Sequence, residues 1–345
     1  MTSGSDKRAQ DKNVTRALVA RAYPAGRPDG DGAPDRVDAR HEAAHDETRI
    51  GRRLLLAGVT ALGALPAATA QAAPRFVGAS RSFRTSDGVN LHYIDAMPES
   101  GAGAEHVLVF IPGWTMPGWI FSPQLSYFAQ YCRVIALDPR GQGDSEIPDR
   151  GYTAQRRGQD IAELLAVIGA PKVVLIGWSL GVLDSLAYVS AHGGGRLAAL
   201  VLIDNSIGEN PPPRANPAPR GHHGPPLPYP AQMRAFVRGM FHTPQSQAYL
   251  DRLTATCLIT PPPAARALLN YQVPRIFWRN AVYAAGVPIL YCVRPHLSGQ
   301  AGNLAHNDPD AECVIFSDAG HALFVDDAAR FNTVLANFLR QKVWT

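Results

Sequence analysis

Short apolar segments recur at intervals along the chain from residue 90 onward. The segment "NLHYIDA" (residues 90–96) alternates polar and apolar side chains, which is typical of a β-strand with one buried face. Six further segments are continuous apolar runs, several of them rich in β-branched residues, and each stops at a turn signal. These are residues 106–111, 133–137, 172–177, 197–203, 288–293 and 312–316. Their pattern predicts parallel strands that are buried on both faces.

Helical periodicity fills the intervals between these strands. In "TAQRRGQDIAELLAVIGA", Ile161, Leu164, Leu165 and Ile168 recur at helical spacing, and Thr153 is a candidate N-cap. The segment "DDAARFNTVLANFLRQ" near the C-terminus has the same periodicity. Strands that alternate with helices predict an α/β fold, with a mostly parallel, doubly wound sheet and helices on both faces.

One region interrupts this alternation. Residues 207–230 are crowded with proline and glycine, which predicts a mobile loop. Residues 231–279 that follow have amphipathic helical patterns. Because ligands bind at the C-terminal edge of such sheets, we expect a helical lid at about residues 207–279, inserted between two strands. A subdomain that serves only packing is the alternative interpretation.

The composition is that of a globular protein. The chain has 345 residues, is 46% hydrophobic and has a formal net charge of only +4. Lysines and arginines are scattered without a run of like charges, so we expect no nucleic-acid partner. The spacing of Cys132, Cys257, Cys292 and Cys313 does not indicate a metal site, and three of them lie in apolar runs as buried cysteines do.

The N-terminal part differs from the rest. Residues 1–48 are polar and aperiodic, which predicts a disordered extension. In residues 49–72, the arginine pair at 52–53 precedes an apolar stretch that ends in the small-residue pattern "AQA" at 70–72. This layout predicts a secretory signal of the twin-arginine type, and hence export of a mature domain at 73–345 to the periplasm or the exterior. A membrane anchor is the alternative, but glycines and a proline make the stretch weakly apolar for a membrane span, so we expect no stable membrane insertion of the mature chain.

A Gly-x-Ser-x-Gly motif, "GWSLG" at residues 177–181, follows the predicted strand at 172–177 and precedes a predicted helix. Strand, motif and helix in this order form a nucleophile elbow, a tight turn that lifts the serine to the end of the strand near a helix N-terminus. Ser179 is therefore the candidate nucleophile.

Four motifs together resemble the α/β-hydrolase superfamily, in its branch of small serine esterases, over about residues 80–345. They are "FIPGWTMPGW", "LDPRGQGDS", "GWSLG" and "DAGHALFVDD". The resemblance implies an α/β-hydrolase fold and a small-molecule ester substrate, with no metal and no cofactor. It also implies a histidine base that comes last in chain order, and His321 in "SDAGHALF" follows the last predicted strand as that base should.

The carboxylate partner of the histidine is less obvious. In many relatives it follows the strand that we expect at 288–293, but Arg294 and His296 stand there in this chain. Asp204 ends the preceding strand in "VLIDNS", as in relatives such as haloalkane dehalogenases. We therefore favour Asp204 over Asp308 or Asp310, whose place before the last strand suits a turn.

Arg294 has three interpretations. It is predicted to be a surface or structural arginine. The alternatives are that it pairs with Asp204 or that it holds an acidic group of the substrate.

The oxyanion of an acyl-transfer reaction needs backbone N–H donors. Leu180, which follows the serine, supplies one of them, and by resemblance Trp114 supplies the other, because Pro112-Gly113 replaces the His-Gly pair common in the family. Trp114, Trp119 and Trp178 are expected to line an apolar pocket, although aromatic residues of this kind also occur in cores.

These features predict an exported serine hydrolase that cleaves small carboxylic esters through an acyl-enzyme, with a triad of Ser179, His321 and Asp204. A cofactor-free haloperoxidase or perhydrolase, a lactonase or an amidase with the same triad is the alternative enzyme. Dehalogenases and epoxide hydrolases are disfavoured, because they carry aspartate in place of Ser179. A ligand-binding module that keeps the fold is the alternative without catalysis.

Overall fold

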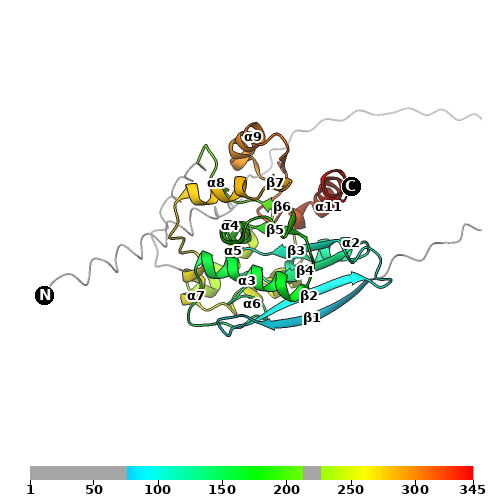
Figure 1. Ribbon diagram of the computed structural model, residues 1–345. Coiled ribbons are helices and arrows are strands. Elements are labelled where there is room, and N and C mark those ends of the chain that lie inside the picture. Colours follow the sequence, from blue (N-terminus) through cyan, green and yellow to red (C-terminus); the bar gives the residue numbers. More distant parts are fainter. Residues whose placement is uncertain (1–75, 213–226, 345) are drawn as a thin grey trace, which may run out of the picture. The chain divides into compact units, whose positions relative to one another are not determined.

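Residues 76–212 and 227–344 are described by the computed structural model of the chain. Eight strands in these ranges form one sheet in the order β1-β2-β4-β3-β5-β6-β7-β8, in which only β2 runs against the others (Figure 1). The strands are β1 (Phe76–Arg84), β2 (Asn90–Pro98), β3 (Val107–Ile111), β4 (Arg133–Leu137), β5 (Val173–Trp178), β6 (Leu197–Ile203), β7 (Ile289–Val293) and β8 (Glu312–Ile315). The predicted mostly parallel sheet is confirmed. The predicted extension at 1–48 and signal at 49–72 lie outside the described residues.

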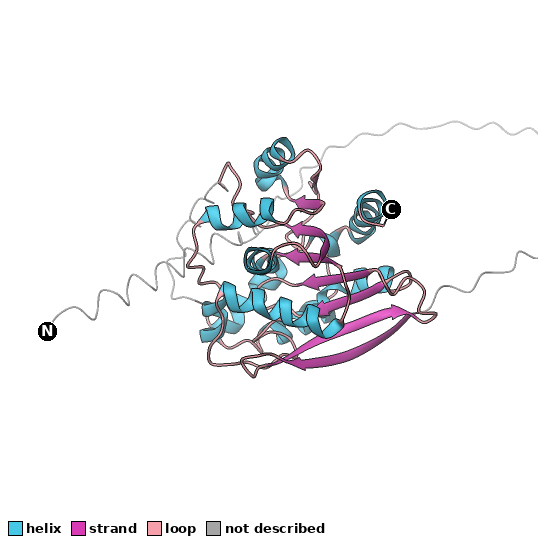
Figure 2. Ribbon diagram, viewed as in Figure 1, coloured by secondary structure: helices cyan, strands magenta, loops and turns pink. Residues whose placement is uncertain are grey.

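The central strands are buried along their whole length. Every residue of β3 and β5 is buried, whereas buried and more exposed residues alternate along β2. These patterns are those expected from the apolar runs and from the alternating segment, because helices cover both faces of the parallel part of the sheet (Figure 2).

The strand β1 has no counterpart among the predicted elements. Most of its residues from Gly78 onward are exposed, so "FVGASRSFR" carries no apolar pattern that sequence reading could detect. The strand lies at the edge of the sheet and pairs only with β2, with Phe83 opposite Leu91.

Helices lie on both faces of the sheet. The helices α3 (Ala154–Ile168), α4 (Leu180–His192) and α8 (Arg275–Ala284) pack together on one face, and α2 (Ser122–Phe128), α10 (Leu323–Asp326) and α11 (Ala328–Lys342) pack together on the other (Figure 1). Thr153 caps α3 as predicted, because its side chain accepts a hydrogen bond from the backbone N–H of Arg156. Two more elements, η2 (Pro295–Leu297) and α9 (Ser298–Asn307), join β7 to β8.

Four helices separate β6 from β7. They are α5 (Tyr229–Gly239), α6 (Gln247–Cys257), α7 (Pro262–Leu268) and α8. We call α5–α8 the inserted helices. The helical character expected for 231–279 is present and extends to Ala284, whereas most of the predicted mobile loop, residues 213–226, lies outside the described residues.

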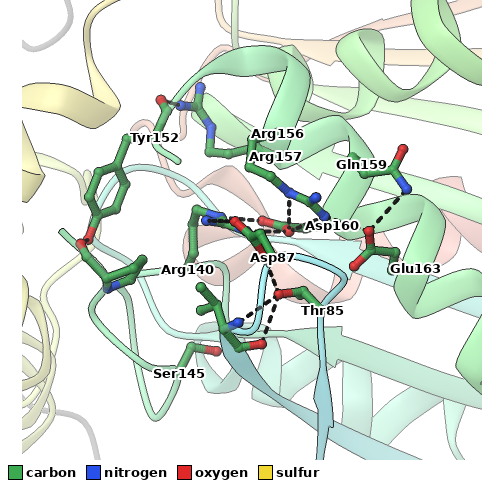
Figure 3. A network of polar contacts seen from close by, with 12 residues as sticks. Thr85, Asp87, Arg140, Ser145, Tyr152, Arg156, Arg157, Gln159, Asp160 and Glu163 are labelled. Atoms are coloured by element: carbon green, nitrogen blue, oxygen red, sulfur yellow. Dashed lines mark hydrogen bonds and ion pairs between the residues drawn. The ribbon is translucent and has the colours of Figure 1, made fainter. Parts of the chain in front are cut away.

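A network of ion pairs fixes the segment after β4 to helix α3 (Figure 3). The fully buried Arg140 donates from Nε to Asp160 at 2.6 Å and from Nη1 to Asp87 at 3.1 Å. On α3 itself, Arg156 pairs with Glu163 at 2.8 Å. The turn between β1 and β2, the segment "DPRGQGDS" and α3 are therefore held together by charged groups as well as by apolar packing.

Within residues 76–212 and 227–344, no helix is both long enough and apolar enough to cross a membrane. The four cysteines, which all lie in these ranges, form no disulfide, and three of them are buried.

Candidate active site

Ser179 sits in a strained turn between β5 and α4. Its backbone has φ 55° and ψ −118°, a conformation that residues with a side chain rarely adopt. The flanking glycines make this turn sterically feasible, since a Cβ at Gly181 would lie 2.1 Å from the carbonyl oxygen of Ile111 and one at Gly177 would lie 2.3 Å from that of Gly181. The turn is also tied down from outside, because Asn205 Nδ2 donates to the Ser179 carbonyl at 2.7 Å.

Asp204 and His321 meet at the C-terminal edge of the sheet. Asp204 follows β6, has φ 46° and donates its backbone N–H to the carbonyl of Cys292 on β7 at 2.9 Å. His321 follows β8, and its Nδ1 lies 2.7 Å from Asp204 Oδ2, with both residues buried. The structure thus brings together the predicted acid and the predicted base, at the same sheet edge as Ser179.

Arg294 occupies the end of β7, between the ends of β6 and β8. Its backbone N–H donates to Asp204 Oδ1 at 3.0 Å, and its Nε donates to Asp204 Oδ2 at 2.6 Å. Arg294 therefore pairs with Asp204, which was an alternative to the surface or structural role that the sequence favoured. Arg294 thus stands at the position where many relatives keep their acid, and in this chain it holds the acid that comes from the neighbouring strand β6.

The charges of this cluster follow from its surroundings. Burial alone would raise the pKa of Asp204, but the hydrogen bond and charge of His321 and the charge of Arg294 outweigh it and lower the pKa to about 2. Burial and the charge of Arg294 also lower the pKa of His321 below its ordinary value, against the opposing effect of Asp204. An ionised Asp204 therefore accepts from Nδ1–H of a neutral imidazole, which leaves Nε2 as the basic nitrogen.

The other acids that the sequence offered lie elsewhere. Asp308 and Asp310 precede β8, at the edge of the sheet opposite to His321, which follows that strand. The side chain of Asp310 is 92% exposed and lies 3.7 Å from Nζ of Lys342. Both residues thus lie in a turn before β8, as the sequence predicted.

The loop after β3 is held by one buried glutamine. Gln142 Oε1 accepts from the backbone N–H of Thr115 at 2.7 Å, and its Nε2 donates to the carbonyls of Gly113 at 3.2 Å and Met116 at 3.3 Å. Thr115 has φ 59°, so the loop turns sharply directly after Trp114. Three hydrogen bonds from one side chain therefore define the backbone around the N–H of Trp114.

This loop lies against the serine. A Cβ at Gly113 would lie only 2.9 Å from Cβ of Ser179, so a larger residue there would push the loop away. The loop carries the backbone N–H of Trp114, and α4 begins with the backbone N–H of Leu180. These are the two predicted oxyanion donors, and they belong to the segments on either side of Ser179.

The three tryptophans have different surroundings. Trp178 is 1% exposed, donates from Nε1 to the His321 carbonyl at 2.9 Å and lies beside the imidazole ring, with 5.1 Å between ring centroids. Trp114 donates from Nε1 to the carbonyl of Ala265 in α7 at 2.7 Å. Trp119, in η1 (Gly118–Phe121), lies 4.1 Å below the guanidinium of Arg252 in α6. Trp178 thus supports His321 from the core, and the other two contact the inserted helices.

Three polar residues at the site were not singled out from the sequence. They are Gln142, Asn205 and Asp326, the last of which accepts from the N–H of Gly320, one residue before His321, at 2.7 Å. Gln142 lies within the "LDPRGQGDS" motif and Asp326 within "DAGHALFVDD". Their place in these motifs was the feature of the sequence that could have marked them as site residues.

A mostly parallel eight-stranded sheet that carries a serine elbow and an Asp–His pair at its C-terminal edge defines an α/β hydrolase. Residues 108–334 match the sequence profile of the alpha/beta hydrolase family, and the chain belongs to this family. It is 34% identical over 120 residues to a non-heme chloroperoxidase from Streptomyces lividans, a match that covers 34% of this chain and 42% of that protein. It is also 36% identical over 105 residues to the serine hydrolase BPHL from Homo sapiens, which covers 29% of this chain and 34% of that protein. The chain thus spans about two fifths or less of these relatives.

Solved structures show the same fold over a larger part of the chain. A bromoperoxidase from Bacillus anthracis superimposes with a TM-score of 0.63 at 19% identity, over 76% of this chain and all of that chain. An esterase from Rhodococcus sp. ECU1013 superimposes with a TM-score of 0.61 at 22% identity, over 76% of this chain and 99% of that chain. At these identities the likeness concerns the fold.

Proposed function

We propose that this protein is a serine hydrolase that cleaves small carboxylic esters through an acyl-enzyme. The observation that carries the proposal is the 2.7 Å contact between His321 Nδ1 and the ionised Asp204, at the sheet edge where Ser179 sits on its elbow. A neutral imidazole with a basic Nε2 is the group that a serine hydroxyl needs as its general base.

In the proposed reaction, His321 Nε2 takes the proton of Ser179 as Oγ attacks the ester carbonyl. The N–H groups of Trp114 and Leu180 stabilise the resulting oxyanion. The tetrahedral intermediate collapses, the C–O bond to the alcohol breaks, and His321 returns its proton to the leaving oxygen. Water, deprotonated by the same imidazole, then attacks the acyl-enzyme, the bond between the acyl carbon and Ser179 Oγ breaks to release the acid, and His321 returns its proton to Oγ. Asp204 stabilises the imidazolium in both halves.

The likeness to non-heme haloperoxidases supports a second candidate on the same residues. If hydrogen peroxide replaces water as the attacking group, the acyl-enzyme yields a peracid and free Ser179. Peroxide-dependent formation of peracetic acid from acetate measures this activity, and p-nitrophenyl ester hydrolysis without peroxide measures the first.

The test of both is Ser179→Ala. We expect the variant to lose ester hydrolysis and labelling by a fluorophosphonate while its circular dichroism stays that of the parent protein, because a triad without its nucleophile keeps only residual catalysis. Turnover near that of the parent protein in Ser179→Ala would exclude the proposed nucleophile.

We further propose that the protein is exported through a twin-arginine signal. The support is the order of the arginine pair at 52–53, the apolar stretch and the small residues at 70–72. Replacing both arginines by lysine is expected to leave the protein unprocessed inside the cell. Processed protein outside the cytoplasm in that variant would point to a different export route, and an exported protein whose N-terminal sequence starts at Met1 would rule out a cleaved signal.

A further inference from the structure

The carboxylate of Asp326 joins two segments that are far apart in the sequence. Asp326 ends α10, five residues after His321, and its Oδ2 accepts from the backbone N–H of Gly320 and from that of His242, both at 2.7 Å. Its Oδ1 accepts from the backbone N–H of Thr243 at 3.1 Å and from the Thr243 hydroxyl at 2.5 Å. Gln245 Nε2 also donates to Oδ1 at 3.5 Å, so five donors converge on one side chain, and four of them come from the connection between α5 and α6.

A second contact lies on the other side of His321. The backbone N–H of Ala322 donates to the carbonyl of Met240 at 3.1 Å. The two segments are in van der Waals contact as well, since a Cβ at Gly320 would lie 2.3 Å from the Met240 carbonyl oxygen and 2.7 Å from the backbone nitrogen of His242. Both chain neighbours of His321 are therefore linked to residues 240–243. Gly320 is linked to them through Asp326, and Ala322 bonds directly to Met240.

Helix α5 also reaches the loop on the opposite side of Ser179. The ring of Phe236 lies edge-on to that of Trp114, with 5.0 Å between centroids, and Sδ of Met233 lies 3.9 Å from the Thr115 hydroxyl. Helix α5 thus contacts the loop that carries Trp114, and the residues directly after α5 contact the loop that carries His321.

We propose that Asp326 is a positioning residue, which makes the docking of the inserted helices and the alignment of His321 with Ser179 a single event. The inference rests on the proposed function, because it assigns His321 as the base. A carboxylate suits this place because Oδ2 accepts charge-assisted hydrogen bonds from both segments, and Oδ1 accepts further ones from the connection between α5 and α6. An amide would turn an NH2 group toward the N–H donors at one of the two oxygen positions, and the hydrogen bonds made there would be lost.

The test compares Asp326→Asn with Asp327→Asn. Asp327 is the adjacent residue, and within the described part of the chain its carboxylate accepts only from the N–H of Arg330, at 3.4 Å, as the N-cap of α11. We expect Asp326→Asn to lower kcat for a p-nitrophenyl ester by ~10²-fold with KM within a factor of about three, because misplacement of a catalytic group by about 1 Å has an effect of this size. Asp327→Asn is expected to keep kcat and to lose only thermal stability.

A second variant keeps the test decisive if Asp326→Asn folds poorly. Thr243→Val removes the hydroxyl donor on the side of the inserted helices and leaves the contact with Gly320 in place. We expect it to lower kcat by ~3–10-fold, and the double variant to lose less than the product of the two single effects, because both act through one carboxylate.

Two results would overturn the inference. One is a kcat per folded molecule in Asp326→Asn equal to that of Asp327→Asn, and the other is strictly multiplicative effects of Asp326→Asn and Thr243→Val. If Ser179→Ala stays active in the same assay, the proposed function itself fails. If Ser179→Ala is inactive and Asp326→Asn is fully active, only the role of Asp326 is wrong.

Discussion

At the scale of single residues, Asp204 depends on its neighbour from the next strand. Arg294 donates to both oxygens of the carboxylate, so the acid is held in one orientation before any substrate binds. The hydrogen bond and charge of His321, together with these contacts from Arg294, keep it ionised, with a pKa of about 2. The acid therefore serves to orient and stabilise His321 and not to exchange a proton with it.

The first prediction concerns this acid. Asp204→Asn is expected to lower kcat by ~10⁴-fold, because the amide stabilises the wrong tautomer of the imidazole. Asp308→Asn and Asp310→Asn serve as matched controls at the opposite sheet edge and are expected to keep the activity of the parent protein. A crippled Asp308→Asn beside an active Asp204→Asn would reverse the assignment.

The second prediction concerns the pH dependence. The charged and titratable groups that affect His321 are Asp204, Arg294 and His296, and the positive charge of Arg294 disfavours the imidazolium. Arg294→Gln removes that charge, so the pKa of His321 rises. The acid limb of the profile of kcat/KM against pH is then expected to move up by ~1 pH unit. Arg294→Lys keeps the charge and is the control. An acid limb that moves down in Arg294→Gln would show that the charge of Arg294 does not control the pKa of His321.

At the scale of elements, the loop at 113–116 depends on a single side chain from the segment after β4. Gln142, which is only 1% exposed, makes three hydrogen bonds to this loop. An apolar residue of similar size cannot make these hydrogen bonds, and each buried polar group left unpaired lowers the free energy of unfolding by about 1–3 kcal/mol.

The third prediction follows from this arrangement. Gln142→Leu is expected to lower the free energy of unfolding by about 2 kcal/mol and to lower kcat by ~10²-fold, since the N–H of Trp114 loses its fixed direction. Thr85→Val is the control, because it removes buried hydrogen bonds in the turn between β1 and β2 but none of those to the loop at 113–116. Urea unfolding measures the loss of stability and steady-state kinetics measure kcat. If both variants lose similar stability and only Gln142→Leu loses kcat, Gln142 positions the loop for catalysis as well as stabilising the fold. Equal kcat values in both variants would contradict the prediction.

The elements show what a single sequence can reveal. Apolar runs located β3 to β8 to within a residue or two, because a strand buried on both faces leaves a local pattern. The edge strand β1 left none, since most of its described side chains face solvent. Asp204 could be predicted as the acid because Arg294 stands at the position where many relatives keep theirs. The sequence itself therefore excluded that position.

Contacts between distant segments were not predictable in this way. Gln142 meets its partners across 26 to 29 residues, and Asp326 meets His242 and Thr243 across 84 and 83 residues. A polar residue in a loop has the same local appearance whether it faces water or a backbone amide. Pairing of this kind becomes visible only in the folded chain.

At the scale of the whole molecule, ion pairs link the turn between β1 and β2 to helix α3. Burial alone would raise the pKa of Glu163, but hydrogen bonds from Ser86 and Arg156 outweigh it and lower the pKa from 4.5 to about 2. The hydrogen bond from Arg140 likewise lowers the pKa of Asp87 to about 2. Both carboxylates favour the folded state when ionised.

The fourth prediction is the acid sensitivity that follows. Because the pKa of Glu163 is lower in the folded chain, its contribution is fully present above about pH 4.5 and is lost as the pH falls towards about 2. Glu163→Gln is expected to be less stable than the parent protein by about 1–2 kcal/mol at pH 7, after allowance for partial exposure of the side chain. The difference should vanish near pH 2. Urea unfolding at a series of pH values measures it, and a difference that stays constant over this range would contradict the assignment.

The described chain has three residues other than glycine with positive φ, and all three belong to the candidate site: Thr115, Ser179 and Asp204. Such conformations cost about 1–3 kcal/mol each, and glycine would relieve them at an entropic cost of about 0.5–1 kcal/mol. A laboratory selection for heat tolerance that ignores activity should therefore collect glycine at positions 115 and 179, but not at 204, where glycine would leave Arg294 without its carboxylate. Glycine at 179 is also a marker in genome sequences, because a natural homologue that carries it has lost the nucleophile and gained a less strained backbone.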